Sequence, residues 1–123
     1  MNTLQIATRD GRRQFFPGDE IEGTASWQLG EPAKAVELRL FWYTRGKGTT
    51  DAGIVDRARF DHPAQTDEYT FRLKLPDGPY SFSGKLISLI WALELVVEPS
   101  GEAERLEFTV SPTGKEIVLS GAG

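Results

Sequence analysis

Residues 73–98 read LKLPDGPYSFSGKLISLIWALELVVE and contain the longest apolar segment of the chain. Between Ile87 and Val97 every odd position is apolar, whereas the even positions mix apolar and polar residues. Such alternation, with one wholly apolar face, is typical of a strand that packs on a core. The PDGP turn before it and the density of Ile, Val and Trp favour a strand over a helix. We therefore expect the fold to be organised around a long buried strand here.

Alternating patterns of the same kind recur along the chain, separated by turn signals rich in Pro, Gly and Asp. The predicted strands cover residues 3–7, 20–29, 36–43, 69–75, 85–97, 106–110 and 117–119, and residues 54–60 are expected to be an edge strand or irregular. Seven to eight strands without an amphipathic helix predict an all-β fold, an immunoglobulin-like antiparallel β-sandwich. The expected core residues are Trp27, Leu40, Trp42, Phe71, Trp91, Leu93 and Phe108.

Length and composition narrow the classes of function. The 123 residues, 39% of them hydrophobic and 26% charged, fit one globular domain over residues 1–123. A net charge of −4 argues against nucleic-acid binding, which usually requires a basic stripe. Because there is no cysteine, disulfides, thiolate-bound zinc and thiol catalysis are excluded. We see no secretion signal and no apolar stretch long enough to span a bilayer, so we expect a cytoplasmic protein, and the sequence does not indicate membrane contact.

Five short motifs follow one another in a characteristic order. They are Phe16-Pro17-Gly18-Asp19-x-x-x-Gly23, Val36-x-Leu38, Phe71-x-Leu73-x-Leu75-Pro76, Pro79-x-Ser81-Phe82-x-Gly84 and Ile90-Trp91-x-Leu93-x-Leu95. This order, over about residues 15–110, resembles the arrestin-like sandwich of arrestin amino-terminal domains, the related retromer subunit and bacterial sporulation-control proteins. Full arrestins have two sandwiches, and this chain has room for one. The resemblance implies a non-enzymatic protein-binding or scaffolding module; the family's charged cluster and its lipid-binding and receptor-binding residues have no counterparts that we identify here.

Few side chains suggest chemistry. Arg45, Gly46, Lys47 and Gly48 form a candidate anion-binding loop, since glycines free backbone amides beside two cations, but a solvated loop is the simpler alternative. His62, the only histidine, is expected in a surface turn. Asp51, Asp56, Asp61, Asp67 and Glu68 lack the spacing of a calcium loop. We therefore predict no catalytic residue, no metal and no cofactor.

The candidate interface lies on the outward rows of two strands that we expect to be neighbours. Its residues are Phe41, Tyr43, Leu86, Ile90 and Val96. Together they would expose more apolar surface than a monomer usually leaves uncovered, which predicts a homodimer or a protein partner. One alternative is that Ile117, Val118 and Leu119 fold over this face. Another is a carbohydrate-binding module in which Phe41 and Tyr43 act as stacking platforms.

Two glycines are expected to be structural. Gly23 falls on the core-facing row of its strand, where a side chain would clash or the strand would bulge. Gly84 precedes the long strand, and we expect it to adopt a backbone conformation that other residues resist.

Overall fold

The computed structural model of the chain describes residues 2–48 and 50–119. Its elements are β1 (Thr3–Thr8), the 3₁₀ turn η1 (Arg9–Gly11), β2 (Gln14–Phe15), β3 (Glu20–Gln28), β4 (Ala35–Gly46), β5 (Ala52–Asp61), β6 (Thr66–Lys74), β7 (Phe82–Ser83), β8 (Ile87–Glu98), β9 (Ala103–Val110) and β10 (Ile117–Val118). Every strand expected from the sequence is present. The two-residue strands β2 and β7 were not predicted, because two residues are too few to show a period.

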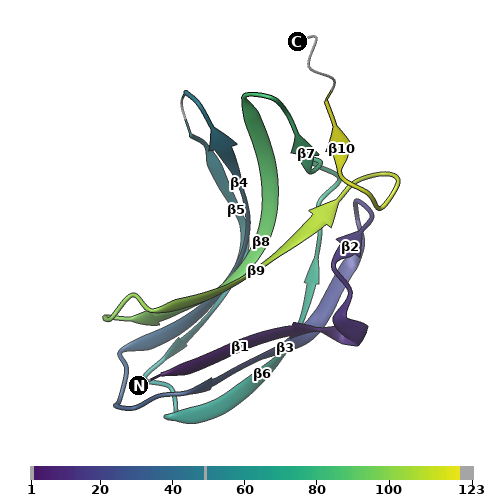
Figure 1. Ribbon diagram of the computed structural model, residues 1–123. Coiled ribbons are helices and arrows are strands. Elements are labelled where there is room, and N and C mark those ends of the chain that lie inside the picture. Colours follow the sequence, from purple (N-terminus) through teal and green to yellow (C-terminus); the bar gives the residue numbers. More distant parts are fainter. Residues whose placement is uncertain (1, 49, 120–123) are drawn as a thin grey trace.

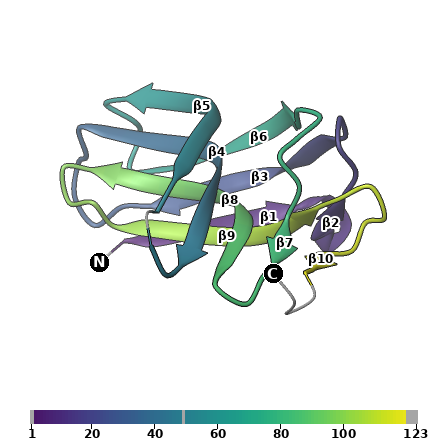
Figure 2. The ribbon, with the colours of Figure 1, turned by 90° about the horizontal axis from the view of Figure 1, so that it is seen from above.

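The strands form two sheets that face each other (Figure 1). The small sheet has the order β1-β3-β6 and is antiparallel throughout. The large sheet has the order β10-β7-β8-β4-β5. Strand β9 pairs with β8 from Ala103 to Phe108 and with β2 at Thr109 and Val110. Seen from above, β4, β8 and β9 lie over β3 and β1 as two layers (Figure 2). The predicted all-β sandwich is therefore confirmed, and β5 is an edge strand as expected.

The core lies between these layers and is centred on β8. The odd-numbered row of β8 from Leu89 to Val97 is buried, and Trp91 is its largest member. The indole Nε1 of Trp91 donates a hydrogen bond to the Pro79 carbonyl at 2.8 Å, so its one polar group is satisfied inside the core. The ring of Phe108 packs against Trp91 at a centroid distance of 6.2 Å.

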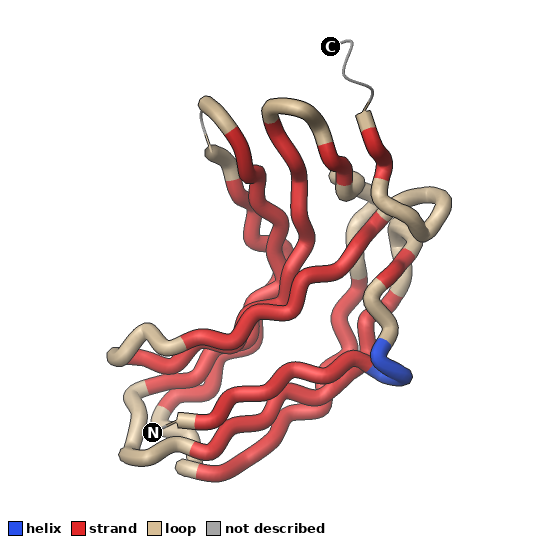
Figure 3. Tube along the Cα trace, in the orientation of Figure 1, coloured by secondary structure: helices blue, strands red, loops and turns tan. Residues whose placement is uncertain are grey.

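Six of the seven predicted core residues are buried, and Trp42 is the exception. Strands β4, β5 and β8 bend at mid-length and rise past the small sheet (Figures 1 and 3). Trp42 lies between Gly53 of β5 and Trp91 of β8 and packs against the core without being enclosed by it. It is half-buried and packs on Gly53, where an added Cβ would lie 2.5 Å from the indole Nε1.

Gly23 and Gly84, the two glycines predicted to be structural, both lie where neighbouring atoms leave no room for a side chain. A Cβ at Gly23 would lie 2.2 Å from the Ala7 carbonyl oxygen and 2.5 Å from the Phe71 ring, as expected for a crowded core position. A Cβ at Gly84 would lie 2.5 Å from the Ile87 carbonyl oxygen. The backbone of Gly84 is not among those with a positive φ, so the prediction of an unusual conformation was wrong.

Candidate functional site

Strand pairing brings most of the predicted interface onto the outer face of the large sheet. Strands β4 and β8 are antiparallel neighbours, with Tyr43 opposite Ile90 and Phe41 opposite Ala92. The expectation that all five predicted residues are exposed was nevertheless wrong. Phe41 and Val96 are only 8% and 9% exposed, whereas Leu86 is 62% exposed.

Arginine side chains explain why this face is covered. The Arg105 guanidinium, on β9, stacks over Phe41 at 5.1 Å and over Tyr43 at 4.9 Å from the ring centroids. The two rings also stack on each other at 5.9 Å. Val96 lies between Glu37 and Ala103 on the adjacent strands. Because Arg105 covers both rings, Phe41 and Tyr43 are not an open stacking platform, and the aromatic form of the carbohydrate alternative is not supported.

The same face carries an ion-pair network around a buried carboxylate. Glu37 is only 3% exposed, and its carboxylate accepts a hydrogen bond from Arg39 Nε and lies 3.7 Å from Arg59 Nη1. Arg59 Nη2 also lies 2.8 Å from Glu98 Oε2. The two groups form an ion pair, but their geometry is not that of a well-aligned hydrogen bond. The Arg39 hydrogen bond lowers the pKa of Glu37 against the opposing effect of burial, and the charges of Arg39, Arg57 and Arg59 add to this lowering. The charges of this face are therefore largely satisfied internally.

The candidate anion-binding loop is tied into this network. Arg45 Nη2 donates to the Tyr43 hydroxyl at 2.8 Å and lies 3.3 Å from Glu107, and the Tyr43 hydroxyl itself donates to Glu107. Gly46 has a φ of 143° and leaves room for the Leu86 carbonyl, which accepts a hydrogen bond from the Lys47 amide. An anion at this loop would have to compete with Glu107 for Arg45. The solvated-loop alternative fits the geometry better.

An exposed apolar strip remains at the upper end of the outer face. Ile54 is 50% exposed on β5 directly opposite Phe41, and Tyr43 and Ile90 are half-buried beside it. Leu86 immediately precedes β8 and lies next to the Gly46–Lys47 backbone. We call Ile54, Tyr43, Ile90 and Leu86 the apolar strip. Ile54 was missed from the sequence because a bulge between Leu40 and Phe41 shifts the register of β5.

The described end of the chain, Ile117 to Leu119, lies away from this strip. Ile117 and Val118 form β10, which pairs in parallel with β7 and extends the large sheet at its edge. The Leu119 amide donates to the Ser83 carbonyl at 2.8 Å. Since β7 and β8 separate β10 from β4, the alternative in which the tail folds over Phe41 and Tyr43 was wrong.

The other polar residues considered from the sequence are scattered. His62 is exposed in the turn between β5 and β6, with a φ of 49° and its amide donating to the Lys34 carbonyl. The described residues contain no group of three or more His, Cys, Asp or Glu side chains arranged to hold a metal ion. In the same residues no helix has the length and apolarity that crossing a membrane requires.

A second face, on the small sheet, was not predicted. Its outward positions form three rows across β1, β3 and β6: Thr3, Gln28 and Thr66; Gln5, Ser26 and Glu68; Ala7, Thr24 and Thr70. We call these nine residues the hydroxyl–amide platform. Glu68 carries its one charge. The polar members of the alternating patterns are visible in the sequence, but only the strand order shows that they share one surface.

The comparisons with known proteins bear on the fold. No protein-family model and no curated protein matches the chain. Among solved structures, the chain is similar to Spo0M, the sporulation control protein of Bacillus subtilis, with a TM-score of 0.60 and 15% sequence identity over 89% of this chain and 49% of that one. This likeness establishes a shared arrestin-like sandwich fold, in agreement with the order of motifs in the sequence. The chain spans about half the length of Spo0M.

Proposed function

We propose that the chain is a non-enzymatic protein-binding module, one sandwich over residues 1–123, that docks a folded protein on the apolar strip. The observation that carries the proposal is a difference between two parts of the outer face of the large sheet: ion pairs cover one part, and large apolar side chains are exposed on the other. Ion pairs seal the lower part around Glu37, while Ile54 and Leu86 stay exposed above it. Protein–protein interfaces commonly combine exposed large apolar side chains with polar groups at their rim.

The surroundings of the strip suit a protein partner. Tyr43 is half-buried at its centre, with the Arg45 and Arg105 guanidinium groups over its ring and Glu107 bound to its hydroxyl. Tyrosine and arginine are enriched at the energetic centres of interfaces, and a polar rim excludes water from them. Their mutual contacts hold these side chains in place before binding, which reduces the ordering cost of association.

An enzyme is the less supported class. The one histidine is exposed in a turn, at the opposite end of β5 from the strip. Within the residues described, no cluster of ligating side chains offers a metal centre. The fold shared with a sporulation control protein supports a regulatory or scaffolding role.

Site-specific photo-crosslinking tests the proposal in the native cell. A photoreactive phenylalanine analogue at Leu86 should form an adduct with one protein, identified by mass spectrometry. The matched control places the same analogue at Val118, which is 76% exposed on β10. The double variant Ile54→Asp with Ile90→Lys should weaken the interaction at least about tenfold, because it puts charge into the apolar centre.

Each result has a definite meaning. An adduct of the chain with itself, together with a doubled mass in light scattering, identifies the partner as a second copy. An adduct with another protein that is lost in the double variant identifies a heterologous partner. Equal adducts at positions 86 and 118, or none at 86, would overturn the proposal. Circular dichroism of the double variant verifies that it is folded.

A further inference from the structure

Aspartate side chains occupy backbone amides along one edge of each sheet. Three aspartates accept a hydrogen bond, through Oδ1, from the amide of the next residue: Asp51 from Ala52 at 2.9 Å, and Asp56 from Arg57 and Asp67 from Glu68, both at 2.8 Å. We call each of these contacts a cap. The first two lie along β5, the edge of the large sheet, and the third lies on β6, the edge of the small sheet.

The Glu68 amide points away from β3, to the side where a further strand would bind. Along an antiparallel strand, successive amides point alternately toward the partner strand and away from it. The Gln65 carbonyl accepts a hydrogen bond from the Leu29 amide, which places the Glu68 amide, three residues on, on the open side. The amides of Thr70 and Arg72 then point the same way. Because β6 pairs with β3 over nine residues without a register shift, this open row is regular.

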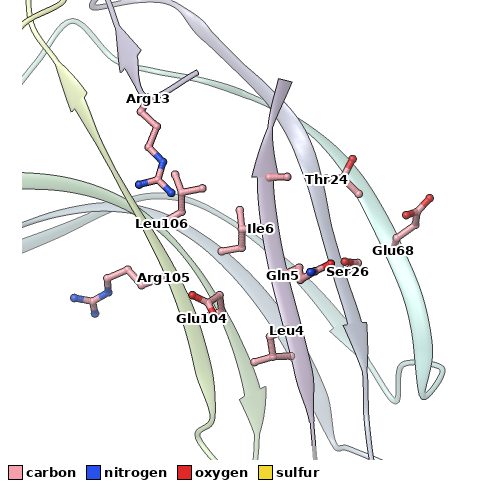
Figure 4. Close-up of a pocket in the computed structure, with 11 residues that line it drawn as sticks. Leu4, Gln5, Ile6, Arg13, Thr24, Ser26, Glu68, Glu104, Arg105 and Leu106 are labelled. Atoms are coloured by element: carbon pink, nitrogen blue, oxygen red, sulfur yellow. The ribbon is translucent and has the colours of Figure 1, made fainter. Parts of the chain in front are cut away.

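The other edge of the small sheet is less open. Strand β1 lies across from β9, and the hollow of about 650 Å³ there has Leu4, Ile6 and Leu106 among its lining residues (Figure 4). In the same view Glu68 projects from β6 on the side of the small sheet that is turned away from β9 (Figure 4). Within the described residues β6 pairs only with β3. Strand β6 is therefore the edge at which this sheet could be extended.

The side chains of β6 on the outer face form a self-complementary row. They belong to Thr66, Glu68, Thr70, Arg72 and Lys74. If a second β6 runs antiparallel to the first about a two-fold axis at Thr70, Glu68 of each copy lies opposite Arg72 of the other. Both residues have their amides on the open side, so each such pair would exchange two backbone hydrogen bonds. Opposite charges directly across two strands stabilise their pairing, and a two-fold interface needs this kind of self-complementarity.

Arg72 is accessible to a carboxylate from a second copy. Its contacts with Glu20 and Glu22, at 2.8 and 3.2 Å, are made by Nε, and its side chain is 67% exposed. A guanidinium has five N–H donors, and those on the two Nη atoms suit a carboxylate. The charge pattern of this edge therefore fits a second copy of the same strand.

We propose that β6 is a self-pairing edge that Asp67 holds closed. The Asp67 carboxylate binds the Glu68 amide, where the Arg72 carbonyl of a second copy would have to bind. A charge placed at a sheet edge is a common means of blocking strand addition. Without this cap, two copies join through an antiparallel β6 pair, and their three-stranded sheets become continuous. This edge belongs to the other sheet from the apolar strip, so the inference goes beyond the proposed protein-binding function and does not depend on it.

The variant Asp67→Ala tests the cap. Its mass in light scattering should double as the concentration is raised, because the Glu68 amide is released for strand pairing. Hydrogen exchange followed by nuclear magnetic resonance should slow at least about tenfold at the Thr70 and Arg72 amides over the same concentrations. The unaltered chain should show no such protection. The exchange measurement is specific to β6, so a dimer formed through the apolar strip would not produce it.

The matched control is Asp56→Ala, which removes the corresponding cap on β5. An antiparallel β5 pair centred on Arg57, Ala58 or Arg59 would place arginine opposite arginine, and a register shift between Leu40 and Phe41 of β4 interrupts the pairing of this strand. Asp56→Ala should therefore leave the mass and the exchange rates unchanged.

A charge reversal tests the register. Glu68→Arg added to Asp67→Ala places arginine opposite Arg72 of the second copy, so this double variant should not pair. The proposal is overturned if Asp67→Ala shows no protection at Thr70 and Arg72, if the unaltered chain is already protected there, if Asp56→Ala pairs equally, or if the double variant pairs as Asp67→Ala does. Circular dichroism verifies that each variant is folded. None of these outcomes bears on the crosslinking result at Leu86, so the two proposals fail separately.

Discussion

The two outer faces of the sandwich use polar side chains in opposite ways. On the large sheet, Glu37 and Glu94 are held by Arg39, Arg59 and Arg105, and the network covers the rings beneath it. On the small sheet, the platform residues are mostly uncharged and free of side-chain hydrogen bonds to the rest of the described chain. One face uses its polar groups to stabilise the monomer, whereas the other leaves them facing the solvent.

The difference shows how a strand pattern of alternating polar residues can serve two purposes. Long charged side chains can reach across strands and pair, so they cover the sheet and become part of the structure. Threonine and serine are too short to reach across strands in this way, and glutamine carries no charge with which to form an ion pair. Among the described residues, the ion pairs of the small sheet lie toward one end, where Arg72 contacts Glu20 and Glu22 and Arg9 contacts Glu22.

Removing the buried charge on the large sheet should have the largest effect. Glu37→Gln keeps the shape of the side chain but leaves Arg39 and Arg59 with less compensation, so it should lower the free energy of unfolding by about 1–3 kcal/mol. Urea unfolding measures the change. Glu68→Gln on the platform is the matched control, because this carboxylate is exposed, and it should change stability by less than about 0.5 kcal/mol. Equal effects at both positions would remove the distinction between the faces.

Acid should weaken the large-sheet network selectively. The folded state lowers the pKa of Glu37, so the stabilisation is fully present above the unfolded-state pKa and is lost as the pH falls through the lower, folded-state value. The difference in stability between the unaltered chain and Glu37→Gln should therefore be constant at neutral pH and shrink as the pH falls below the ordinary glutamate pKa of 4.5. Urea unfolding across this range measures it. A difference that does not change with pH would show that packing, not charge, is responsible.

Removing hydroxyls from the small-sheet face should have the smallest effect. Thr24→Val with Ser26→Ala deletes two half-buried hydroxyls that have no hydrogen-bond partner in the described chain, so stability should stay within about 0.5 kcal/mol of the original. Thermal unfolding followed by circular dichroism is sufficient to measure this. A loss of several kcal/mol would mean that these groups support the fold.

Much of the fold was predictable because its signals are local. Alternation with a period of two identified seven strands and left residues 54–60 open, and the apolar row ending at Val97 identified the buried face of β8. The order of five motifs pointed to the arrestin-like sandwich, whose fold the similarity to Spo0M supports. The close approach of Ala7 and Phe71 to Gly23 was also foreseeable, since glycine on a core-facing row has few other causes.

The surfaces depended on contacts between residues distant in the sequence. Arg105 covers Phe41 only because β9 pairs with β8, and Ile54 joins the apolar strip only because a bulge shifts β5. Gln5, Ser26 and Glu68 are separated by tens of residues and become neighbours through the order β1-β3-β6. The sequence by itself determined which residues alternate and therefore the strands and the core, because that pattern is set by the local geometry of the backbone. Which outward residues meet was decided only by the tertiary structure, because strand order and register follow from the packing of the whole chain.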